Sequence, residues 1–221
     1  MLIYVLFPEV LKLHDKQVEE KGHCAMTYRV MWEYKWLLEH AVEFYQISIG
    51  QFEAICADFQ ERCQHLAYSM KTSYQYQFMF YMYCNEEKAQ EAYKHFLKEK
   101  RGVLSDCAAC ERDMQVRYLL VTGRMNEAEE AAHDLFSGKL HCEEVPNVTY
   151  GQFLRSCNQL IADGNTEVLE KASAYCREIR ASVVREKIGT GYIGDILLYY
   201  SLTDTAKALP FYKKYWHYFE K

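Results

Sequence analysis

One cysteine pair has the spacing of a metal or redox motif. Cys107 and Cys110 form a Cys-x-x-Cys pair, and His141 stands next to Cys142 one predicted helix pair later. Thiolates and an imidazole are ligands of tetrahedral Zn²⁺. Cys107, Cys110, Cys142 and His141 are therefore candidate zinc ligands, if the fold brings the two segments together. We expect no cofactor, and zinc at these residues is the alternative.

Two alternatives remain open for these cysteines. There is no second Cys-x-x-Cys pair, and adjacent residues such as His141 and Cys142 are awkward as two ligands of one ion. The cysteines could instead fill small gaps at a helix start and in a loop, as free cysteines commonly do. A thioredoxin-type redox role is disfavoured because that motif belongs in a βαβ unit.

The sequence contains no strong enzyme signature. His-Glu-x-x-His, Gly-x-Ser-x-Gly and the phosphate-binding loop are all missing. Gly189, Gly191 and Gly194 resemble a glycine-rich loop only superficially, since no strand precedes them, and we interpret them as a turn between helix pairs. We therefore predict no enzyme and no catalytic residue. A metal-dependent enzyme using Cys107, Cys110 and Cys142 is the alternative.

The stretch 118–136, YLLVTGRMNEAEEAAHDLF, predicts two helices folded back on each other. An apolar run ends at Gly123, a polar turn follows, and Ala128 and Ala131 begin a second helix with small residues at helical spacing. This unit resembles the tetratricopeptide repeat, which has a small residue at its turn and an alanine early in its second helix. The resemblance implies an all-α, right-handed stack of antiparallel helix hairpins, that is, a TPR-like α-solenoid.

Equivalent positions recur along the chain. Ala89, Ala128, Leu169 and Ala206 follow one another at separations of 39, 41 and 37 residues, somewhat more than the 34 residues of the tetratricopeptide repeat. We predict one domain over 1–221, with an N-terminal cap at 1–24, formed mainly by a helix from about Pro8. Its five helix pairs are 25–70, 72–100, 105–137, 149–187 and 190–219. An irregular α-bundle is the alternative.

Local signals support particular helices. Residues 72–84 alternate polar and aromatic side chains in the manner of a strand, but we predict a helix because a capped helix follows at once. Asn85 is a plausible N-cap for that next helix. Ser105 or Asp106 is expected to cap the helix after it, and Thr149 the one that begins the fourth pair.

Two further segments carry a resemblance of their own. SDCAACERD at 105–113 and GKLHCEEVPNVTY at 138–150 are similar to a pattern that recurs in uncharacterised bacterial TPR-like proteins. The similarity covers about residues 85–180. It implies a bacterial cytosolic protein with helical repeats and carries no activity.

Composition limits the classes of partner. The 221 residues include nine cysteines and carry a net charge of −5, which disfavours nucleic acids and anionic membranes because both attract basic surfaces. TPR-like bacterial regulators usually carry a basic DNA-binding motif, which residues 1–70 lack. The opening MLIYVLF lacks the basic residues of a secretory signal, and no apolar run is long enough for a membrane span. We expect a cytoplasmic location.

We predict a non-enzymatic module that binds a protein or peptide through a concave groove. In TPR-like stacks the first helix of each pair lines that groove, so aromatic side chains would provide contact area and polar ones would fix the partner. The aromatic residues could instead only pack against neighbouring helices. Another alternative is an immunity or regulatory protein that neutralises a toxin or senses a peptide. The predicted groove residues are Tyr74, Phe78, Tyr81, Asp113, Arg117, Asn158 and Asp195.

Overall fold

The computed structural model describes residues 2–184 and 191–218, and all regular elements in these ranges are helical. The chain divides into two compact units, Met1–Asp106 and Cys107–Lys221. This confirms the predicted all-α class, including a helix rather than a strand in the aromatic segment after residue 70. One continuous domain of five stacked helix pairs stays a prediction.

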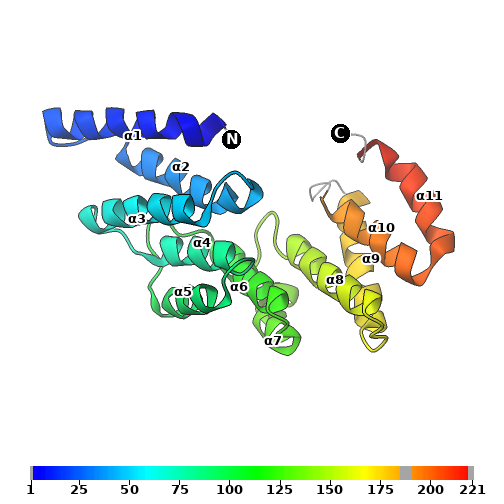
Figure 1. Ribbon diagram of the computed structural model, residues 1–221. Coiled ribbons are helices and arrows are strands. Elements are labelled where there is room, and N and C mark those ends of the chain that lie inside the picture. Colours follow the sequence, from blue (N-terminus) through cyan, green and yellow to red (C-terminus); the bar gives the residue numbers. More distant parts are fainter. Residues whose placement is uncertain (1, 185–190, 219–221) are drawn as a thin grey trace. The chain divides into compact units, whose positions relative to one another are not determined.

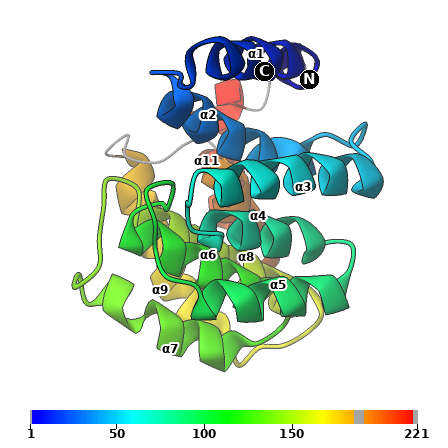
Figure 2. The same ribbon diagram turned by 90° about the vertical axis from the view of Figure 1, so that its left-hand side faces the viewer.

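In its described part, the first unit contains five α-helices. α2 contacts α1, α3 and α4, and α4 in turn contacts α5, the helix that follows it in the chain (Figure 1). Figure 2 shows α1 and α2 above α3, α4 and α5. The helices are α1 (Leu2–Lys21), α2 (Thr27–His40), α3 (Ile49–His65), α4 (Lys71–Tyr81) and α5 (Glu86–Lys98), with a 3₁₀ turn, η1 (Ala41–Glu43), after α2.

Over the residues that the structure describes, the second unit contains three helix pairs followed by a short 3₁₀ turn. α8 contacts α6, α9 and α10, so it lies between the first helices of the neighbouring pairs. A hydrophobic core of the second unit is built from apolar side chains such as Leu154, Cys157 and Ile179. The elements are α6 (Ala108–Val121), α7 (Met125–Phe136), α8 (Asn147–Ala162), α9 (Leu169–Val184), α10 (Gly191–Thr203), α11 (Thr205–Tyr215) and η2 (Trp216–Tyr218).

Turn chemistry explains several helix ends. The Asn85 side chain accepts a hydrogen bond from the Lys88 backbone N–H, which confirms the predicted N-cap of α5. Gly123 and Gly138 follow α6 and α7 with φ of +74° and +76°. This left-handed conformation closes a helix and strongly favours glycine. The tight α6–α7 turn is therefore the one that the 118–136 stretch predicts.

The N-terminal helix begins earlier than predicted. α1 begins at Leu2 and continues through Pro8, rather than beginning near that proline. The turn before Pro8 is held by tertiary contacts, because the Tyr4 hydroxyl donates to the Leu37 carbonyl and the buried Phe7 ring packs against Tyr34. These contacts offset the backbone hydrogen bond that proline cannot donate.

Some predictions fall outside the described residues. They concern Met1 of the N-terminal cap, residues 185–187 of the fourth pair, residues 190 and 219 of the fifth, and Gly189 of the predicted turn. Gly191 and Gly194, which the same predicted turn included, lie instead in α10. Among the described helices, none has the length and apolar composition that crossing a membrane would require.

Candidate functional site

The first turn of α6 carries two of the predicted metal ligands. Cys107 is the N-cap residue, and its Sγ accepts a hydrogen bond of 3.3 Å from the backbone N–H of Cys110. The predicted caps Ser105 and Asp106 are therefore wrong. Asp106 instead forms a 2.7 Å ion pair with the buried Lys35.

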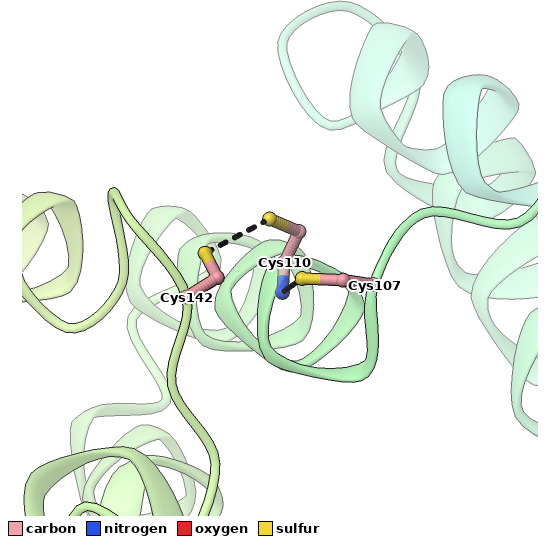
Figure 3. A group of neighbouring side chains, drawn as sticks. All are labelled: Cys107, Cys110 and Cys142. Atoms are coloured by element: carbon pink, nitrogen blue, oxygen red, sulfur yellow. Dashed lines mark hydrogen bonds between the residues drawn. The ribbon is translucent and has the colours of Figure 1, made fainter.

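The loop between α7 and α8 brings the third thiol to the same place (Figure 3). Cys142 and Val145 form a tight turn, in which the Cys142 N–H donates to the Val145 carbonyl and the Val145 N–H donates to the Cys142 Sγ over 3.4 Å. Val145 is buried and anchors this turn. The Cys142 Sγ lies 3.6 Å from the Cys110 Sγ, and the three sulfurs all lie within 4.8 Å of one another.

His141 does not join this group, contrary to the sequence prediction. Its side chain is exposed, and Nδ1 lies 3.0 Å from the Gly138 carbonyl oxygen. Within the described chain, the group of potential metal ligands at this place consists of Cys107, Cys110 and Cys142 alone. The imidazole is held by a local backbone acceptor three residues earlier in the loop.

The thiols differ in their electrostatic environment. Partial burial raises the pKa of the Cys107 thiol. Hydrogen bonds from the Cys110 backbone and from the other two thiols together lower it by more than burial raises it, so the pKa lies below its ordinary value. Burial and the adjacent thiols raise the pKa of Cys110. Such an arrangement favours one thiolate beside neutral thiols. The thiolate can act as a nucleophile or as a ligand of a soft metal ion.

A second polar group lies where α6 meets α8. The buried Asp113 carboxylate accepts hydrogen bonds from the Thr149 hydroxyl at 2.6 Å and from the Gln152 amide at 2.8 Å. Burial raises the pKa of Asp113 to about 6, although these hydrogen bonds and the charge of Arg117 act in the opposite direction. Thr149 is therefore not the helix cap that the sequence predicts, since its hydroxyl bonds to another helix.

The polar group continues where α8 meets α10. Arg155 donates from Nε and Nη2 to the two Asp195 carboxylate oxygens, at 3.1 and 2.9 Å. The buried Asn158 donates to the Asp195 backbone carbonyl, and its own Oδ1 has no hydrogen-bond partner in the described structure. The Arg155 side chain is 59% exposed, and its guanidinium lies 5.9 Å from the centroid of the Tyr192 ring.

These contacts place four of the predicted groove residues, Asp113, Arg117, Asn158 and Asp195, in or beside one polar group of the second unit. We call it the α8 polar face. The sequence analysis predicted Asn158 but missed Gln152, Arg155 and the interhelix role of Thr149. Their signal was a polar residue at every third position up to Asn158, which places each beside the next on the surface of α8.

The aromatic candidates belong to the first unit. Phe78 is fully buried and packs against Phe96, which is the packing alternative that the sequence left open. The Tyr81 ring is also buried, and its hydroxyl donates to Glu53. Tyr74 is half-buried. A cavity of about 260 Å³ between α4 and α5 is lined by Tyr74, Gln77, Tyr81, Lys88, Glu91, Ala92 and His95.

A larger cavity of about 570 Å³ lies in the same unit, lined by apolar residues such as Val18 and Met31 and by a larger number of polar and charged residues. Polar side chains at its wall bond to one another. Arg62 donates to both Asp15 oxygens at 2.6 and 2.8 Å, which holds the pKa of Asp15 at about 2. This volume suits a small ligand, but the polar groups named here already have partners.

Comparison with known proteins gave no relative. No protein-family model, curated protein or solved structure matches the chain.

Proposed function

We propose that this protein is a non-enzymatic, TPR-like helical-repeat module that binds a protein or peptide segment along the α8 polar face. The packing of α8 between α6 and α10 supports this proposal. In a stack of helix hairpins, first helices that pack side by side form a continuous surface on which an extended segment can lie. The partner is a polypeptide rather than a nucleic acid or a membrane, in keeping with the net charge of −5.

The observation that carries the proposal is the fixed orientation of Arg155. Asp195 holds the guanidinium in a bidentate ion pair, while most of the side chain stays accessible to solvent. An arginine that is ordered before binding loses less conformational entropy when it donates to a backbone carbonyl or a carboxylate. Arg117, half-buried on α6, adds a second positive charge beside Asp113.

The unmatched oxygen of Asn158 is consistent with the same role. A buried amide oxygen without a donor is unfavourable, and such groups are uncommon in native proteins. Once the Asn158 amide turns toward the surface of α8, a backbone N–H of a bound segment would satisfy it. The α8 polar face thus offers cationic donors and a neutral acceptor.

A displayed peptide library tests this proposal. The reduced full-length protein would be used to select peptides, which would then be measured against Arg155→Gln and Arg117→Gln. We expect binding to weaken by at least about tenfold in each variant, since hydrogen bonds to charged groups contribute about 1.5–3 kcal/mol. The matched control is Arg177→Gln, because Arg177 is 74% exposed on α9.

Two results would count against the proposal. Selection that enriches no peptide family above the background of the empty display particle would remove the peptide-binding role. Peptides that bind wild type, Arg155→Gln and Arg117→Gln equally would show that binding takes place elsewhere. Circular dichroism of each variant would establish that its helices remain folded.

A further inference from the structure

The three sulfurs have the separations of ligands on one metal ion. Zn²⁺–sulfur bonds are about 2.3 Å long in tetrahedral sites, so two thiolates on the same ion lie about 3.8 Å apart. The Cys110 and Cys142 sulfurs are 3.6 Å apart, and the Cys107 sulfur lies within 4.8 Å of both. A shift of less than about 1 Å in the Cys107 side chain would place the three sulfurs at three corners of such a tetrahedron.

The backbone around the sulfurs already provides outer-shell hydrogen bonds. The Cys107 sulfur accepts from the Cys110 N–H, and the Cys142 sulfur accepts from the Val145 N–H. In both cases the donor is three residues further along the chain. Hydrogen bonds of this kind orient metal ligands and stabilise their charged form. Two separate segments thus bring hydrogen-bonded sulfurs to the same place. Cysteines that only fill small gaps in the packing would not need these hydrogen bonds.

The fourth position of such a site would be open. His141, the other candidate ligand from the sequence, is exposed, and its ring nitrogens do not belong to the described group of ligand atoms that lie within 4.8 Å of one another. Cys107 is exposed, so the group can be reached from solvent. Glu143 and Glu144 are also exposed beside Cys142 and make the surroundings more favourable for a cation.

We propose that Cys107, Cys110 and Cys142 bind one Zn²⁺ ion through their sulfurs, and that water or an external donor occupies the fourth position. Each protonated thiol releases its proton to solvent as its sulfur–zinc bond forms. Three thiolates favour Zn²⁺ over Mg²⁺ or Ca²⁺, which prefer oxygen ligands. This proposal does not depend on peptide binding, since the cysteine contacts involve none of the α8 side chains that hold Asp113 and Asp195.

Zinc competition measurements test the proposal directly. Reduced, metal-free full-length protein would be titrated with Zn²⁺ in the presence of a chromophoric chelator, and Co²⁺ would report tetrahedral thiolate coordination through its visible absorption. We expect one ion per chain. Cys107→Ser, Cys110→Ser and Cys142→Ser should each weaken binding by more than about 100-fold, because losing even an outer-shell partner commonly costs 10–100-fold.

Two further variants sharpen the result. Cys84→Ser is the matched control, since Cys84 is an exposed thiol outside the group, and it should bind zinc as wild type does. His141→Ala should also bind as wild type. A comparable loss in His141→Ala would contradict the open fourth position, and equal zinc binding by wild type and all three cysteine variants would show adventitious binding only.

A measurement on the wild-type protein avoids any effect of substitution on folding. Brief alkylation with and without Zn²⁺, followed by peptide mass spectrometry, should show protection of Cys107, Cys110 and Cys142 by zinc but not of Cys84. Equal alkylation under both conditions would overturn the proposal. So would a reduced protein that binds no zinc but forms a Cys110–Cys142 disulfide on mild oxidation, because the group would then be a redox pair.

Discussion

The two units bury charges of opposite sign, and the hydrogen-bond partners of these charges differ. In the first unit the fully buried Lys35 ammonium donates to the Leu104 carbonyl and to Asp106, and it lies 3.5 Å from the centroid of the Trp32 ring. The same carboxylate also accepts from Gln75. Lys71 is bound similarly, by the Phe96 and Glu99 carbonyls at the end of α5. These cations hold separate segments of the unit together.

In the second unit the buried charges are carboxylates, and Asp113 among them has less favourable surroundings. Asp113 has two neutral donors, but its pKa is raised to about 6 because burial outweighs them. Gln152 Oε1 and Asn158 Oδ1 are buried without a hydrogen-bond partner in the described structure. Groups that are satisfied point to a structural role, whereas groups with remaining capacity point to a site. The comparison therefore points to a structural role for the buried charges of the first unit, and the polar groups around Asp113 and Asn158 in the second unit are the ones on which the proposed binding rests.

Removing the buried cation of the first unit should have the largest effect. We expect Lys35→Met to lower the free energy of unfolding by about 3–5 kcal/mol, because it leaves the largely buried Asp106 carboxylate without its cation and the buried Leu104 carbonyl without its donor. Urea unfolding of the full chain would measure the loss, and hydrogen exchange should locate it in peptides of the first unit. Lys94→Met, at an exposed position of α5, should change stability by less than about 0.5 kcal/mol.

Removing the buried charge of the second unit should have the opposite sign. We expect Asp113→Asn to raise the free energy of unfolding at pH 7 by about 2–3 kcal/mol, since a pKa near 6 instead of about 3.9 corresponds to about two units at 1.36 kcal/mol each. The new amide could donate to Gln152 Oε1, which has no partner at present, after that side chain rotates.

The pH dependence gives the control for this variant. A raised pKa in the folded state means that the contribution of Asp113 to stability is fully present below about pH 4 and is lost as pH rises through about 6. The difference between Asp113→Asn and wild type should therefore be small at pH 4 and largest at pH 7. A variant that is less stable at both pH values would show that the lost hydrogen bonds outweigh the charge, and the contrast between the units would fail.

Much of the helical architecture could be predicted from local chemistry. Asn85 before two glutamates and Gly123 after an apolar run mark helix ends through short-range hydrogen bonds and backbone conformation, which depend on few neighbours. The approach of Cys142 to the Cys107 and Cys110 pair was also predictable, because a helix hairpin returns its exit loop to the level where it began.

Features that depend on tertiary partners could not be predicted in this way. Thr149 is a residue type that often caps helices, yet its hydroxyl donates a hydrogen bond to Asp113 on another helix. The burial of Lys35 depends on Asp106, 71 residues away, so neither residue signals it alone. His141 contains nitrogen atoms that could bind a metal ion, but the loop conformation determines that its ring bonds to a local carbonyl.

A smaller effect should come from the close approach of α8 to α10. A Cβ atom at Gly151 would lie 2.0 Å from a carbon of the Tyr192 ring, so the ring must move. We expect Gly151→Ala to destabilise the protein by about 1–2 kcal/mol in urea unfolding, which is typical of overpacking. In a Tyr192→Ala background the same change should become stabilising by about 0.5–1 kcal/mol, because alanine favours a helix more than glycine does. An unchanged cost in both backgrounds would contradict the ring contact.

The smallest expected effect on stability separates binding from folding most sharply. Arg155→Gln removes an ion pair whose arginine is largely exposed but whose Asp195 partner is buried, and because the glutamine amide can still donate to Asp195, the free energy of unfolding should fall by only about 1 kcal/mol. Thermal unfolding and peptide affinity would be measured on the same preparation. If Arg155 serves binding, affinity for selected peptides falls at least about tenfold while the unfolding temperature barely moves. If it serves the fold, as Lys35 does in the first unit, stability falls by several kcal/mol, and the difference in role between the buried charges of the two units disappears.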